Sequence, residues 1–91
     1  MYTPISTKDF KKSLKKIERS GLYNSSEIEK VINIISSGRK LGTKYQDHAL
    51  TGKMSIYREC HIKSDLLLLY QIKKDKLVLL LININNHSNL F

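Results

Sequence analysis

The 91-residue chain has few of the residues that define several classes of protein. It has one cysteine, Cys60, so no disulfide can form within the chain, and it has no tryptophan. Its apolar runs are six residues or fewer, far below the roughly 20 that a membrane-spanning helix needs. The first residues also lack the apolar segment of a secretory signal. We therefore expect a cytoplasmic protein that does not enter a membrane.

Acidic residues are scarce as well. Eight Asp and Glu oppose 16 Lys and Arg, and the net charge is +8. Such an excess of positive charge favours a polyanionic partner, either a nucleic acid or an acidic protein. Many of the cations fall in residues 7–20, where they either form a solvated helix face or contact the phosphates of an RNA.

The first half of the chain predicts one short strand and two helices. Residues 2–6 contain Pro4, which cannot donate a backbone hydrogen bond, so a strand here should lie at a sheet edge. Apolar residues recur at helical spacing over 7–20 and again over 25–37, and Gly21 separates the two helices. Helices this close in sequence should form an antiparallel hairpin with a common apolar face.

The second half predicts a sheet. Residues 38–53 are polar and rich in glycine, and we expect a loop there that carries His48. Strand-like apolar runs follow at about 54–61, 65–73 and 76–84. The chain is thus expected to be one α+β domain, residues 1–91, with a two-helix hairpin on one face of a four-stranded, mainly antiparallel sheet in the order β-α-α-β-β-β.

All three histidines, His48, His61 and His87, lie in this second half. Alternation along a strand places Glu59 and His61 on the same face. Cleavage of RNA without a metal needs a base for the ribose 2′-hydroxyl, a cation for the phosphate and an acid for the leaving oxygen. Histidine serves as base or acid, and Lys or Arg supplies the cation, so the chain holds the ingredients of such a site.

These residues resemble a known family, the RelE/ParE toxin superfamily, and within it the YafQ-type mRNA interferases. The resemblance covers the second half closely. It rests on Asp47-His48-x-Leu50-x-Gly52, Arg58-Glu59-Cys60-His61-x-x-x-Asp65, Tyr70 and His87-Ser88-x-Leu90-Phe91. The first half agrees in its pattern of two helices.

The resemblance implies an endoribonuclease toxin of a type II toxin–antitoxin pair. Such a toxin cuts mRNA in the ribosomal A site, needs no metal or other cofactor, and is silenced by a cognate antitoxin protein. The catalytic residues it implies are His48, Glu59, His61, Asp65 and His87. Phe91 would stack on a base or shape the pocket.

The chain departs from the family pattern at three positions. Leu66 replaces a common tryptophan, Asn83 replaces an arginine four residues before the last histidine, and Asn85 replaces a glycine. Because asparagine cannot neutralise a phosphate, the missing charge must come from elsewhere. The candidates for this contact with the substrate are Lys44, Lys53, Arg58 and Lys63.

Other interpretations remain open at this point. The chain could be a non-catalytic toxin resembling ParE, which inhibits DNA gyrase by binding, or a basic RNA-binding module. A His-rich zinc site is disfavoured because no two of the His and Cys residues stand two or four residues apart. Cys60 fits a buried strand position, and Asp65 fits either a turn or a catalytic role.

Overall fold

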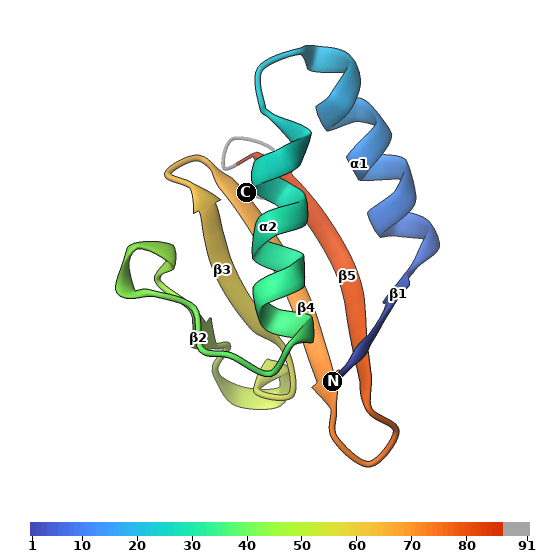
Figure 1. Cartoon of the computed structure of the whole chain (residues 1–91), viewed down its shortest axis with the longest axis vertical. Coiled ribbons are helices and arrows are strands. Elements are labelled where there is room, and N and C mark those ends of the chain that lie inside the picture. The colour runs from blue at the N-terminus through green and yellow to red at the C-terminus, as the bar shows by residue number, and fades with distance from the viewer. Residues whose placement is uncertain (87–91) are drawn as a thin grey trace.

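The computed structural model describes residues 1–86 and places two helices on one face of a sheet (Figure 1). The elements in chain order are β1 (Thr3–Ser6), α1 (Lys8–Ser20), α2 (Ser25–Ser36), β2 (His48–Ala49), β3 (Arg58–Lys63), β4 (Leu66–Lys73) and β5 (Val78–Asn86). Two short 3-10 turns, η1 (Thr43–Tyr45) and η2 (Gly52–Met54), flank β2. The predicted α+β class and both predicted helices are confirmed.

Side-chain caps define where the helices begin. The Thr7 hydroxyl oxygen accepts a hydrogen bond from the Phe10 amide (3.1 Å) and donates one to the carbonyl of Ile82 (2.8 Å), which ties α1 to β5. Asn24 caps α2 through the amide of Ser26 (3.0 Å). Gly21 ends α1 in the left-handed region, at φ 69°, as its position predicts. No helix within residues 1–86 is long and apolar enough to cross a membrane.

Within residues 1–86 the strands form one sheet in the order β1-β5-β4-β3-β2. β1 pairs in parallel with β5, and the other neighbours are antiparallel. Pro4 therefore lies on an edge strand, as expected. The sheet has five strands where the sequence predicted four, because His48–Ala49 adds β2 within the expected loop.

The strand expected from residue 54 begins only at Arg58. Residues 52–54 instead form η2, and the Tyr57 amide donates to the carbonyl of Met54 (2.9 Å), which closes a turn before β3. This turn returns the chain so that the Leu50 amide reaches the carbonyl of Tyr57 (3.0 Å). β2 and β3 are thereby placed side by side.

The two faces of the sheet have different roles. Cys60, Leu68 and Ile84 are register partners on neighbouring strands, and all three are fully buried in the core with the helices. Phe10, Ile17, Ile28, Val31 and Ile35 cover them from α1 and α2. Since side chains alternate along a strand, their neighbours Glu59, Leu69 and Asn83 face away from the helices.

Candidate active site

The pairing of β2 with β3 brings His48 opposite Glu59 on the face of the sheet away from the helices. The His48 Nε2 atom lies 3.6 Å from Glu59 Oε1. The His48 side chain is 51% exposed and that of Glu59 is 20% exposed, so the pair is open to solvent and to a substrate. The structure thus joins two of the residues expected from the sequence.

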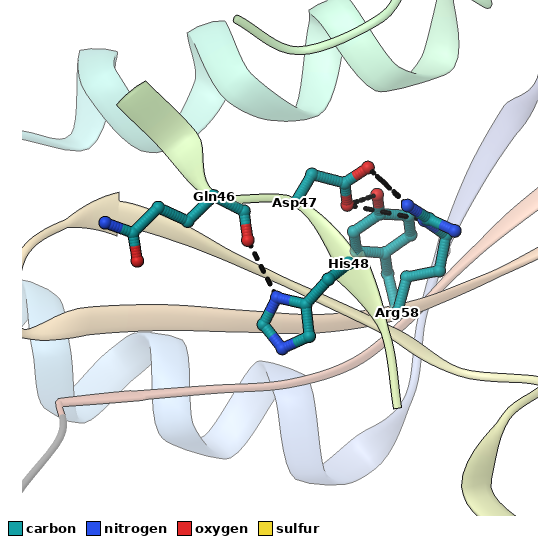
Figure 2. Close-up of polar contacts among 5 residues, drawn as sticks. Gln46, Asp47, His48 and Arg58 are labelled. Carbon is teal, nitrogen blue, oxygen red and sulfur yellow. Dashed lines mark hydrogen bonds and ion pairs between the residues drawn. The ribbon is translucent and has the colours of Figure 1, made fainter. Parts of the chain in front are cut away.

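The other ring nitrogen of His48 also has an oxygen partner. Nδ1 lies 2.8 Å from the carbonyl oxygen of Gln46 (Figure 2). A backbone carbonyl and a carboxylate can only accept hydrogen bonds, so a proton on either ring nitrogen of His48 faces an acceptor. His48 can therefore serve as a proton donor.

His61 lies two residues beyond Glu59 on the same face of β3, about 7 Å further along the strand. Its Nδ1 atom lies 3.3 Å from the carbonyl oxygen of Ser64. When Nδ1 carries the proton, Nε2 keeps a free lone pair and can act as a base. The three residues His48, Glu59 and His61 are here called the His48–Glu59–His61 group.

A groove of about 350 Å³ opens beside His61, at the edge of β3 that β2 leaves unpaired. Its lining includes three cations, Lys30, Lys44 and Lys63. Lys44 Nζ lies 5.0 Å from the centre of the Tyr45 ring, and Lys63 pairs with Glu27 at 2.8 Å. An exposed ion pair such as Lys63–Glu27 and an exposed contact between an ammonium group and a ring such as Lys44–Tyr45 are both weak, so both ammonium groups can turn to a phosphate.

Behind the His48–Glu59–His61 group, Asp47 is held by two partners. Arg58 Nη2 lies 2.8 Å from Asp47 Oδ2, and the Tyr70 hydroxyl donates to Asp47 Oδ1. Figure 2 shows the Asp47 carboxylate and the His48 ring pointing to different sides of the short strand. Asp47 therefore fixes β2 from the helix side while His48 faces the site.

Asp47, Arg58 and Tyr70 form a cluster that is here called the anchor. Within it, the pKa values of Arg58 and Tyr70 are raised. The hydrogen bond from Arg58 to Asp47 raises the pKa of the guanidinium. Burial, followed by the hydrogen bond to Asp47, raises the pKa of the Tyr70 phenol. Both shifts keep Arg58 charged and Tyr70 protonated over the physiological range, so the anchor stays intact there.

Two expected site residues lie elsewhere. Arg58 faces the helices and its guanidinium is engaged by Asp47, so it does not join the His48–Glu59–His61 group as a contact for the substrate. Asp65 lies in the β3–β4 turn, where its Oδ2 accepts a hydrogen bond from the Tyr23 hydroxyl (2.7 Å) in the connection between the helices. Burial and this carboxylate raise the pKa of Tyr23. The expected convergence of Asp65 with the histidines is thus not seen in its contacts.

Of the remaining candidates, His87 and Phe91 lie outside the described residues. Asn83 pairs with Leu69, which pairs with Glu59, so Asn83 lies in the same row across the sheet as the His48–Glu59 pair. Its side chain oxygen accepts a hydrogen bond from the Ile84 amide (2.9 Å).

Two observations concern whether a thiol or a metal ion could take part in the chemistry of the site. Cys60 is fully buried, as its strand position predicted, and burial raises the pKa of its thiol to about 12. A thiol that stays protonated and covered is a poor nucleophile or ligand. In the part of the chain that the structure describes, no three His, Cys, Asp or Glu side chains are grouped closely enough to hold a metal ion.

Sequence reasoning missed the role of Asp47 and the partner of Asp65. The signal for Asp47 was its place next to His48, since adjacent strand residues point to opposite faces. Tyr70 was part of the motif, but its contact with Asp47 spans 23 positions and depends on the strand register. Nothing in the local sequence marks Tyr23 as the partner of Asp65.

Comparison with known proteins identifies the family and the fold. The family described as the bacterial toxin of type II toxin–antitoxin system, YafQ, matches residues 2–91. A protein of Haemophilus influenzae, named as a candidate toxin YafQ, is 58% identical over 31 residues, which are 34% of this chain and 30% of that protein. This local match therefore spans about a third of each.

Solved structures match over the whole chain. A metal-bound toxin from Helicobacter pylori is 41% identical with a TM-score of 0.91, and each chain covers 100% of the other. YafQ from Escherichia coli BL21(DE3) is 21% identical with a TM-score of 0.87, covering 100% of this chain and 99% of that one, which shows a common fold. Because the family match extends over nearly every residue, this chain belongs to the YafQ family of toxins of type II toxin–antitoxin systems.

Proposed function

We propose that the chain is an endoribonuclease that cleaves mRNA, in the ribosomal A site, by acid–base chemistry that needs no metal. The observation that carries the proposal is the His48–Glu59–His61 group on an exposed face of the sheet. The group offers a proton donor and a proton acceptor within reach of one substrate. Membership of the YafQ family supports the same chemistry.

The contacts of the two histidines assign a different role in proton transfer to each. His61, with Nδ1 directed to Ser64, takes the proton of the ribose 2′-hydroxyl at Nε2. The oxygen then attacks the adjacent phosphorus, and the bond to the 5′-oxygen breaks. His48, held between Gln46 and Glu59, gives a proton to that leaving oxygen. Glu59 lies beside the His48 ring and orients it.

Cations that line the groove beside His61 would neutralise the charge on the phosphate. Lys44 and Lys63 both line it, and Lys44 was expected to contact the substrate. An ammonium group near the phosphorane stabilises the charge that develops in the transition state. His87 and Phe91 remain candidates for proton transfer and base stacking through the family resemblance.

The test is cleavage of a translated mRNA by the wild type and by the variants His48→Ala and His61→Ala. Each variant should cleave about 10²–10⁴-fold more slowly, the usual contribution of a positioned proton transfer. Binding to ribosomes should persist, because it depends mainly on Lys and Arg contacts with phosphates. His87→Ala tests the residue outside the described range in the same assay.

Several outcomes would redirect the proposal. Rates equal to the wild type in both variants would remove these histidines from the chemistry. Loss of cleavage on adding a chelator would overturn the metal-independent mechanism. If the wild type itself cleaves no RNA, inhibition of DNA gyrase in the manner of ParE, or simple RNA binding, becomes the function to test.

The proposal includes a cognate antitoxin as partner. YafQ of Escherichia coli has been solved in a toxin–antitoxin complex with DinJ. The net charge of +8 on this chain suits a partner that carries acidic side chains. Co-expression with the protein encoded beside this chain should restore growth, and rescue that survives charge reversal of that protein's acidic residues would contradict the electrostatic argument.

A further inference from the structure

A second and larger groove lies on the helix side of the sheet, away from the His48–Glu59 pair. It has a volume of about 500 Å³. Its walls come from the end of α2 and the segment after it, from the start of β3 and from the end of β4. The anchor residues Asp47, Arg58 and Tyr70 form part of its lining. We call it the basic groove.

The floor of the basic groove is apolar. Leu41 and Ile72 are half-buried at its base, and Ile56 leaves 58% of its surface exposed. Exposed isoleucine beside half-buried apolar side chains is surface that gains free energy when a partner covers it. This floor distinguishes the basic groove from the cation-lined face of α1, whose hollow is lined only by Lys and Arg side chains.

The rim of the basic groove is positively charged. Arg39, Lys40 and Lys74 line it, and none of them forms an ion pair with another residue in the range 1–86. Among the described residues of the lining, Asp47 carries the acidic charge, and it is already held by Arg58 and Tyr70. The rim therefore presents cations that no acid of the groove neutralises.

An apolar floor within a positively charged rim is complementary to a particular kind of ligand. We propose that the basic groove is the docking surface for a segment of a partner protein in which apolar side chains alternate with carboxylates. The apolar side chains would cover Ile56 and Leu41, and the carboxylates would meet Arg39, Lys40 and Lys74. This inference rests on the proposed function, in which the partner is the antitoxin.

RNA is the less suitable occupant. A nucleic acid gains most of its affinity from phosphates and would find more cations on α1, at Lys8, Lys11, Lys12, Lys15, Lys16 and Arg19. It would also leave the exposed Ile56 side chain uncovered by an apolar group. A protein segment satisfies the charge and the apolar floor together.

The experiment uses the full chain, labelled with ¹⁵N, and a synthetic peptide in which leucine and glutamate alternate. Amide resonances and the dissociation constant are followed during titration by NMR. Shifts should map to Leu41, Ile56 and Lys74. The triple variant Arg39→Glu/Lys40→Glu/Lys74→Glu should bind the peptide about tenfold more weakly or worse, because it replaces each attraction at the rim by a repulsion.

The matched control is Lys11→Glu/Lys12→Glu/Lys15→Glu on α1, which changes the net charge by the same amount. It should keep the affinity of the wild type within about twofold, since these sites are outside the groove. Equal weakening in both triple variants, shifts that map to α1 or to the His48–Glu59 pair, or no binding of the peptide would overturn the proposal. Tighter binding of oligouridylate at the same amides would assign the groove to RNA instead.

The same variants separate this inference from the proposed function. None of Arg39, Lys40 and Lys74 belongs to the His48–Glu59–His61 group, so the groove variant should cleave RNA at the wild-type rate when the RNA is saturating. Normal cleavage without peptide binding would reject the docking surface alone. Peptide binding without cleavage by any form of the protein would reject the nuclease alone.

Discussion

At the scale of single residues, strand alternation decides which side chains reach the candidate site. Asp47 and His48 are adjacent, yet one is held against the helix side and the other faces Glu59. Arg58 and Glu59 likewise point to opposite faces of the sheet from β3. A charged residue next to a catalytic candidate is thus not necessarily part of the same site.

The position of Asn83 gives a prediction at this scale. Asn83 lies in the same row of the sheet as Glu59, through Leu69. The variant Asn83→Arg would place a guanidinium on this face, where it can meet two phosphate oxygens while the amide brings no charge. We expect faster cleavage of a translated mRNA.

The control for that variant is Asn33→Arg. Asn33 is exposed on α2, on the side of the sheet away from Glu59, and its substitution gives the same change in net charge. If Asn33→Arg accelerates cleavage as much as Asn83→Arg, the gain reflects general attraction of RNA and not a phosphate contact in the site.

At the scale of elements, the least expected feature is β2. Two residues, His48 and Ala49, are too few to give a strand pattern in the sequence, so the segment was predicted as loop. The longer elements were predictable, because α1, α2, β4 and β5 each carry an apolar period over eight or more residues. The partner of Asp65 was not, since Tyr23 lies 42 positions away and meets it only through the packing of the helices on the sheet.

The anchor should determine how firmly β2 is held. The variant Tyr70→Phe removes the hydroxyl that donates to Asp47 and keeps the buried ring. The lost hydrogen bond to a carboxylate should lower the free energy of unfolding by about 1–3 kcal/mol. Hydrogen exchange at the Leu50 amide, which bonds the carbonyl of Tyr57, should become faster.

Tyr2→Phe is the matched control, because it removes a phenol hydroxyl that contributes to neither β2 nor the anchor. It should leave exchange at Leu50 unchanged. Faster exchange in both variants, or in neither, would show that Tyr70 does not hold β2 through Asp47.

At the scale of the whole molecule, the core predicts how stability depends on pH. Burial raises the pKa of the Cys60 thiol from 9.0 to about 12, and the pKa of Tyr70 is raised as well. The folded state favours the protonated, neutral form of each of these two groups. Their contribution is therefore complete below about pH 9 and is lost as the pH rises toward 12, where the unfolded chain ionises first.

For Cys60 this contribution amounts to about 4 kcal/mol between those limits. The variant Cys60→Ala removes the thiol that ionises. Its free energy of unfolding, measured by denaturant at several pH values, should fall less steeply above pH 9 than that of the wild type. Parallel curves for the two proteins would show that the buried thiol does not contribute to alkaline unfolding.

The central claim concerns the whole site: His61 acts as the base and His48 as the acid. The most direct measurement is the pH dependence of the cleavage rate for the wild type, His48→Ala and His61→Ala. A base must be deprotonated and an acid protonated, so the wild-type rate should fall on both sides of an optimum. We expect His61→Ala to lose the fall at low pH and His48→Ala to lose the fall at high pH; if both variants keep both falls, proton transfer does not pass through these histidines.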